Sequence, residues 1–152
     1  YFALDTWRDE LPQGAVLSLT QTRDGYMWIG TFEGLVRFDG VKFDTYDKRN
    51  TPAIRSNNIK ALCEDRSGAL WIGTLGVVRY INGEFTNFTT KDGLANDFGQ
   101  SIAETPDGAI WVATNAGLSR YFEGKWTNFS VKDGLCHNSG YRLSVAPDGA
   151  LW

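Results

Sequence analysis

The most reactive side chains in this chain are a cysteine and a histidine next to each other. Cys136 places a thiol beside the imidazole of His137, the two groups that a cysteine nucleophile and its base would need. Neighbouring residues of an extended segment point in opposite directions, however, so a catalytic pair is not expected. His137 is also the only histidine among the 152 residues, which leaves no histidine cluster for a metal ion. We therefore predict no catalytic residue, no metal site and no cofactor.

Three arginines at similar spacing could instead bind an anion. Arg37, Arg79 and Arg120 each close a short Gly-Leu-x-Arg-Phe-like run. A residue that recurs at the same place in every copy of a repeat is explained by the repeat itself. We therefore expect these arginines to bond within or between the repeated units, and we look for function among residues that do not recur.

The element that positions all these residues is a repeat of about forty residues. Its copies share a turn dipeptide that leads into a short aromatic and β-branched run, and their tryptophans, Trp28, Trp71, Trp111 and Trp152, are spaced 43, 40 and 41 residues apart. A fixed period of this length is typical of the four-stranded blade of a β-propeller. We predict an all-β fold, a β-propeller fragment of about three and a half four-stranded antiparallel blades with open ends, in which the tryptophans form the core.

Each repeat gives four strand signals separated by turn signals. Nine residues before each tryptophan stands an apolar residue that we expect to face the core: Leu19, Leu62, Ile102 and Leu143. Its neighbours are small, as an innermost strand near a narrow axis requires, and Arg142 breaks that pattern. The first strands are predicted at residues 16–21, 59–64, 99–104 and 140–145. Tight hairpins are predicted at Asp39-Gly40, Asn82-Gly83 and Glu123-Gly124, where Glu is the poorest partner for the glycine.

The repeated residues resemble the two-component regulator propeller family. The resemblance lies in the Asp-Gly-x-Leu-Trp-Ile-Gly-Thr core, the Gly-Leu-x-Arg-Phe close and the Lys-Asp-Gly-Leu segments at Lys91 and Lys132, and it spans essentially the whole chain. The second copy departs from it with Ser67 and with one residue fewer after Thr74, which predicts a shorter loop there, and the third departs with Ala113. The resemblance implies a sensor domain on the periplasmic or extracytoplasmic side of a bacterial inner-membrane signalling protein, a histidine kinase or a diguanylate cyclase, whose output domain lies elsewhere.

The repeat boundaries predict how the chain is organised. We expect a closing outer strand at 1–7, blades at 8–46, 47–88 and 89–129, and the first half of a fourth blade at 130–152. A closed propeller needs roughly four to eight blades. The expected partners of the open ends are therefore the remaining blades of a longer propeller or, as the weaker idea, a second copy of the chain.

Composition excludes several classes of partner. The net charge is −3 and the chain has no run of lysines or arginines, which argues against nucleic acid. No apolar stretch approaches the roughly 20 residues of a membrane span, so no membrane contact by this segment is expected. Cys63 takes a slot that small residues hold in other copies, so we assign it to packing and expect no disulfide with Cys136.

Variation is concentrated in the loops that join fourth to first strands and second to third strands, which lie on one face of a propeller. A small molecule or an oligosaccharide could bind there, since an axial funnel is a concave site with convergent polar groups. The position eleven residues before each tryptophan holds Leu17, Lys60, Gln100 and Tyr141, a mixed set. The candidate ligand-binding residues are Lys60, Gln100, Tyr141, Arg142, His137, Asn138, Asn57, Asn96 and Asn115.

Three functions remain open. The first is a non-catalytic sensor module that binds a small ligand, and the second is a propeller for protein–protein contact without a small ligand. The third is a propeller lyase, which one histidine argues against.

Overall fold

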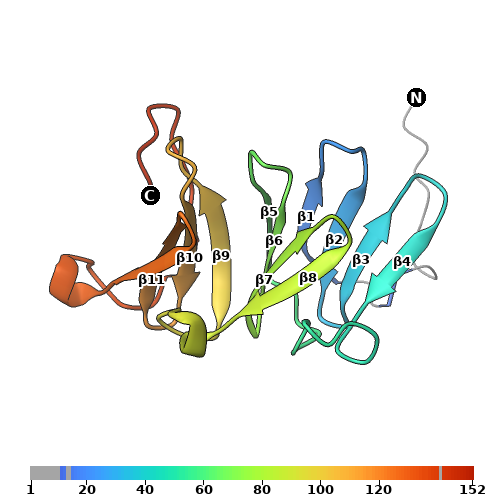
Figure 1. Ribbon diagram of the computed structural model, residues 1–152, viewed down its shortest axis with the longest axis horizontal. Helices are drawn as coiled ribbons and strands as arrows, with labels where there is room; N and C mark the ends of the chain where they lie inside the picture. Colours follow the sequence, from blue (N-terminus) through green and yellow to red (C-terminus); the bar gives the residue numbers. More distant parts are fainter. Residues whose placement is uncertain (1–10, 13–14, 141) are drawn as a thin grey trace.

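Twelve strands form three antiparallel sheets in the part of the chain that the structure describes. The computed structural model describes residues 11–12, 15–140 and 142–152 (Figure 1). The three sheets stand side by side as blades, each with its strands in chain order from the inner to the outer edge. The predicted all-β propeller fold is confirmed, whereas the closing strand predicted at 1–7 lies outside the described residues.

The strands follow the predicted repeats closely. The first blade consists of β1 (Val16–Gln21), β2 (Met27–Thr31), β3 (Leu35–Phe38) and β4 (Phe43–Tyr46). The second consists of β5 (Ala61–Glu64), β6 (Leu70–Thr74), β7 (Gly76–Ile81) and β8 (Glu84–Phe88). The third consists of β9 (Gly99–Glu104), β10 (Ile110–Thr114), β11 (Gly117–Phe122) and β12 (Lys125–Phe129). Two short 3₁₀ helices, η1 (Thr90–Asp92) and η2 (Val131–Asp133), follow the outer strands of the second and third blades.

The core lies between blades rather than within them. One apolar layer joins Trp28 and Leu35 of the first blade to Leu70 and Ile72 of the second. The next layer joins Trp71 of the second blade to residues of the third. Trp28 and Trp71 are thus each buried by the blade that follows, and Trp71 is 1% exposed. Trp111 is half-buried and Trp152, which no described blade follows, is 78% exposed.

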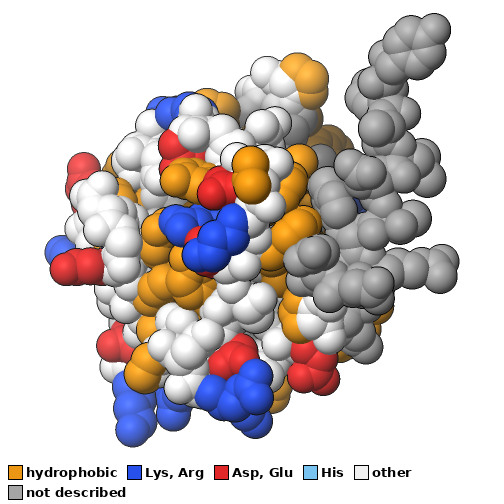
Figure 2. Space-filling model, turned by 90° about the vertical axis from the view of Figure 1, so that its right-hand side faces the viewer, with side chains coloured by type: hydrophobic (Ala, Val, Ile, Leu, Met, Phe, Trp, Pro, Cys, Tyr) orange, Lys and Arg blue, Asp and Glu red, His pale blue; other side chains and the backbone are white. Residues whose placement is uncertain are grey.

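The same arrangement corrects the prediction for Leu19. Leu62 packs against the layer shared with the first blade, and Ile102 is buried against the second. Leu19 is 58% exposed, because this position faces the preceding blade and no described blade precedes β1. Figure 2 views the molecule from the side of the first blade, where hydrophobic side chains gather beside the residues drawn in grey.

Two of the tight hairpins form as predicted and one does not. Asn82 and Glu123 adopt left-handed backbone at φ 51° and 49° before their glycines, the conformation that a two-residue turn requires. Glu123 does so although Glu is a poor residue for it. Asp39 instead begins a four-residue loop, in which its carboxylate accepts hydrogen bonds from the backbone of Val41 and Lys42.

The first strands of the second and fourth repeats are shorter than predicted. Lys60 precedes β5 and its backbone N–H donates to the carbonyl of Gly73 at 2.9 Å. Residues 142–145 form no strand, and within the fourth repeat Val145 and Leu151 form an isolated antiparallel bridge beside two backbone hydrogen bonds between Ser144 and Trp152. The physical reason is that this segment pairs with one short partner only, without a neighbouring third strand.

The recurring arginines stack on their tryptophans, as their expected structural role requires. The guanidinium carbons of Arg37, Arg79 and Arg120 each lie 5.8 Å from the ring centroid of the tryptophan on the adjacent strand. Arg37 also pairs with Asp44 at 3.0 Å, and Arg120 pairs with Asp107 at 2.7 Å.

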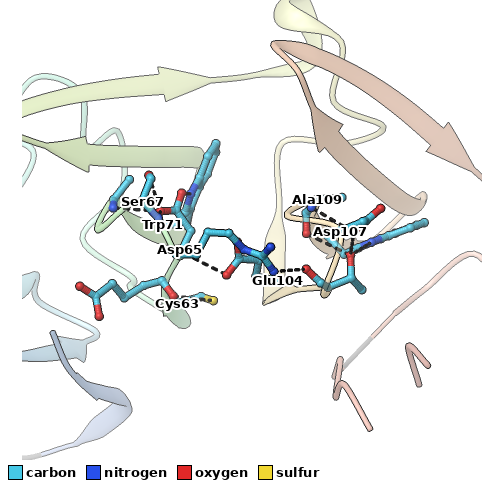
Figure 3. Close-up of polar contacts among 12 residues, drawn as sticks. Cys63, Asp65, Ser67, Trp71, Glu104, Asp107 and Ala109 are labelled. Atoms are coloured by element: carbon cyan, nitrogen blue, oxygen red, sulfur yellow. Dashed lines mark hydrogen bonds and ion pairs between the residues drawn. The ribbon is translucent and has the colours of Figure 1, made fainter. Parts of the chain in front are cut away.

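Polar contacts tie the blades together on the face that carries the turns between first and second strands. Arg66 of the second blade donates to Glu104 of the third at 2.8 Å, and Arg23 contacts Glu64 in the same way at 3.6 Å. Figure 3 shows these turns, where Asp65 accepts the indole N–H of Trp71 at 2.7 Å. The opposite face, which we call the loop face, is left to carry the variable residues.

Candidate functional site

The inner strands surround a cavity of about 410 Å³ at the propeller axis. Strands β1, β5 and β9 lie side by side there, and residues 142 and 143 continue the wall. Strands of this kind point alternate side chains toward the axis. The cavity is lined by Leu17, Ser18, Leu19, Lys60, Ala61, Leu62, Ser101, Ile102, Arg142 and Leu143.

Three of the predicted site residues form one hydrogen-bonded chain. The Lys60 ammonium donates to Oε1 of Gln100 at 3.0 Å, and Nε2 of Gln100 donates to Oδ1 of Asn115 at 3.1 Å. Lys60 precedes β5, Gln100 lies on β9 and Asn115 lies in the turn between β10 and β11. The chain therefore joins the second and third blades, and none of its contacts is repeated between the first and second.

Arg142 lies on the same cavity as Lys60. It takes the repeat position that Ser18, Ala61 and Ser101 hold in the three blades. The backbone N–H of the next residue, Leu143, donates to Oγ of Ser101 at 3.0 Å, which holds this segment against the inner strand of the third blade. A long cation thus stands where every described blade has a small side chain.

The asparagines fourteen residues before Trp71 and Trp152 support the loops. Oδ1 of Asn57 accepts the backbone N–H of Lys48 at 3.0 Å, and Oδ1 of Asn138 accepts that of Val131 at 2.8 Å. Asp97 holds the same position in the third repeat, and its carboxylate accepts the backbone N–H of Thr90 at 2.6 Å. These side chains are therefore engaged in closing the connection that enters each blade.

The neighbouring position has a second shared role. Oδ1 of Asn96 accepts the N–H of Phe98 at 3.0 Å, and Nδ1 of His137 accepts the N–H of Ser139 at 3.0 Å. Ser56 does the same for Asn58 at 3.3 Å. Hence Asn96 and His137 lie on the loop face in local turns, apart from the Lys60 chain, whereas Tyr141 lies outside the described residues.

A second hollow on the loop face was not among the sequence predictions. It is a pocket of about 170 Å³ between the second and third blades. Asn58 and Lys60 line it with Thr74, Leu75 and Phe98, together with Ser56 and Gly99. Oδ1 of Asn58 is buried and has no hydrogen-bond partner among the described residues. The pocket therefore combines an unsatisfied acceptor with an aromatic wall.

The shortened turn of the second repeat accounts for this pocket. In the first and third repeats the threonine hydroxyl closes its own turn, as Thr31 does on the carbonyl of Gly34 at 2.9 Å. The Thr74 hydroxyl instead donates to the carbonyl of Ser56 at 2.7 Å. Leu75 forms an antiparallel bridge with Phe98 of the next blade. The missing residue after Thr74 was the sequence signal that could have located the pocket.

Of the two free thiols, Cys63 is partly buried and Cys136 is exposed. No group of three or more His, Cys, Asp and Glu side chains among them could hold a metal ion. Burial raises the pKa of the Cys63 thiol to about 11, so Cys63 stays protonated at neutral pH. Over the same residues, the structure has no helix with the length and apolarity to cross a membrane.

Comparison with known proteins identifies the same propeller repeats. Residues 10–33, 53–76 and 92–116 match the family model described as "Two component regulator propeller". The extracellular domain of BT3049 of B. thetaiotaomicron, assigned as a hybrid two component system, has a TM-score of 0.87 and 25% identity over 99% of this chain and 22% of that chain. No curated protein matches the chain significantly.

Two further structures share the fold. The extracellular domain of BT4673 of B. thetaiotaomicron, assigned as a one component system, has a TM-score of 0.78 and 23% identity over 98% of this chain and 21% of that chain. Virginiamycin B lyase from Staphylococcus aureus has a TM-score of 0.71 and 20% identity over 93% of this chain and 49% of that chain. The chain thus spans about a fifth of the length of the two B. thetaiotaomicron structures and about half of the lyase.

Proposed function

The chain carries repeats of the two component regulator propeller family, and from this premise we propose that it is a ligand-sensing part of a membrane signalling protein. The signalling protein is a histidine kinase, a hybrid kinase or a diguanylate cyclase, and this segment lies on the extracytoplasmic side. The similarity to extracellular domains of B. thetaiotaomicron systems supports this placement. The segment binds ligand and performs no chemistry of its own.

The observation that carries the proposal is the polar chain of Lys60, Gln100 and Asn115 beside the axial cavity. Blade architecture does not require it, since no equivalent contact joins the first blade to the second among the described residues. The adjacent pocket supports the proposal because Lys60 lines it together with the aromatic side chain of Phe98.

The ligand is a small molecule or an oligosaccharide, and its binding energy acts on the arrangement of rigid blades relative to the following domain. Blades joined by buried aromatic layers are close-packed and resist deformation. A ligand that bridges the second and third blades therefore favours one arrangement of the signalling protein by its differential affinity.

A thermal-shift screen of the full-length protein against sugars and polysaccharide fragments tests the proposal. A ligand at about 100 times its Kd adds about 2.7 kcal/mol, which raises the unfolding midpoint by several degrees. The same compound should change kinase or cyclase output. Absence of any stabilising compound from a panel of a few hundred would favour the protein-contact alternative.

A further inference from the structure

We propose that the ligand of the axial cavity carries an anionic oxygen group, a carboxylate or a sulfate or phosphate ester, which Lys60 and Arg142 bind together. This inference rests on the proposed ligand-sensing function and specifies the chemistry of its ligand. Lys60 comes from the second blade and Arg142 from the fourth repeat, and both line the same cavity. None of the described residues that line it is acidic.

Neither cation is neutralised by a described residue. The six ion pairs between described residues use other arginines and lysines. The Lys60 ammonium donates one hydrogen bond, to the neutral amide oxygen of Gln100, and an ammonium group has three donors. Arg142 makes no hydrogen bond or ion pair with its side chain to any described residue. Both side chains therefore keep donors for a further acceptor.

Ser18 lies on the same wall but does not offer its hydroxyl to the cavity. It lines the cavity with Lys60 and Arg142, whereas its Oγ atom is buried and lies against Gly30 of β2. The two cations, rather than this hydroxyl, are therefore the groups that would bind the anion.

The two cations also lie at positions where the repeat does not need charge. Lys60 has Leu17 and Gln100 as its counterparts, and Arg142 has the small residues of the inner strands. The three recurring arginines behave differently, because each stacks on a tryptophan. The protein as a whole carries a net charge of −3. Two unpaired cations on one cavity of an acidic protein give that cavity a local preference for anions.

The discriminating experiment compares charged and neutral probes of the same shape. Isothermal titration calorimetry of the full-length protein at low salt would use D-glucuronate and D-galacturonate, with D-glucose and D-galactose as their neutral counterparts. Inorganic sulfate and phosphate test whether the anionic group alone suffices. We expect a uronate or an inorganic anion to bind at least tenfold more tightly than the neutral sugars, and added NaCl to weaken that binding.

Substitutions at Lys60 and Arg142 test whether these two side chains cause the preference for anions. Lys60→Met and Arg142→Met should each weaken anion binding about tenfold. Lys60→Arg keeps the charge and should retain most of the affinity. Lys91→Met is the matched control, since Lys91 is exposed within η1 and does not line the axial cavity. Thermal unfolding of each variant without ligand establishes that it is folded.

The outcomes separate this inference from the proposed function. Neutral sugars that bind as tightly as the uronates, or anion binding that survives both methionine substitutions in folded protein, would overturn the inference and leave the sensor function standing. Failure of every anionic and neutral probe, together with a blank screening panel, would overturn both.

Discussion

Replacing Trp71 by alanine should lower the free energy of unfolding by about 3–5 kcal/mol, the usual cost of emptying a buried aromatic site. The ring is 1% exposed, and its centroid lies 5.2 Å from that of Tyr121 and 5.9 Å from that of Phe88. Trp111→Ala should cost about half as much, because Trp111 is half-buried. Urea unfolding of the full-length protein, followed by circular dichroism, measures both.

Substitution by phenylalanine separates the contribution of ring packing from that of the indole N–H hydrogen bond. Trp71→Phe keeps most of the packing but removes the hydrogen bond from the indole to the Asp65 carboxylate at 2.7 Å. Bonds to charged groups contribute about 1.5–3 kcal/mol. Trp111→Phe removes a bond to the neutral Thr105 hydroxyl at 3.0 Å, so about 1 kcal/mol is expected. Equal losses for the two alanine substitutions would refute the idea that the following blade supplies the burial, and equal losses for the two phenylalanine substitutions would refute the difference between the two hydrogen bonds.

Three further outcomes are expected. Glu123→Asn should stabilise the protein by about 0.5–1 kcal/mol in urea unfolding, because Asn tolerates left-handed backbone better than Glu; a loss of stability would contradict the turn assignment. Arg66→Ala should cost about 0.5–1 kcal/mol, as its bridge to Glu104 is half exposed, and high salt should erase the difference from wild type. The side chain of Arg49 and backbone N–H groups hold the pKa of Asp47 at about 2, so its stabilisation is present above about pH 4 and is lost as pH falls toward 2. Acid unfolding of Asp47→Asn should therefore be less steep in that window, and an unchanged profile would exclude this carboxylate as a contributor.

The repeat period was sufficient to predict the blades, because a four-stranded sheet uses its residues in the same way each time. Burial was harder to predict. Leu19 and Leu62 occupy the same repeat position, yet only Leu62 packs against a preceding blade. Exposure at such a position depends on which neighbour is present, and a pattern within one repeat carries no information about that neighbour.

The candidate site was predicted only in part, for a related reason. Lys60, Gln100 and Asn115 were grouped by their variability, and the structure brings them into one chain. Asn57 and Asn138 were grouped with them, yet their side chains close the loops that enter the blades. Asp97, a different residue type at the same position, accepts the equivalent backbone hydrogen bond. A comparison of residue types at this position therefore suggested functional variation, although the residues share one structural role.

The turns before the tryptophans show how hydrogen-bonding roles persist when residue types change. In the first repeat the hydroxyl of Thr22 donates to Asp24 at 2.6 Å and accepts the tryptophan N–H. In the second repeat the types are exchanged, and Ser67 donates to Asp65 at 2.5 Å while Asp65 accepts the indole. The residue types differ, but two equivalent hydrogen bonds form in each turn.

Residues are therefore better sorted by the contact they make than by their type. By this criterion the exchanged turn and the loop asparagines belong to the blade. The contacts of Lys60 with Gln100, the hydroxyl of Thr74 on Ser56, and the unpaired Arg142 have no counterpart in the other described repeats. All of them lie at the axial cavity or at the pocket beside it. Blade stability alone gives no reason for the contacts that differ between repeats to lie close together. Their common location at the cavity and the pocket is what selection for ligand binding would produce.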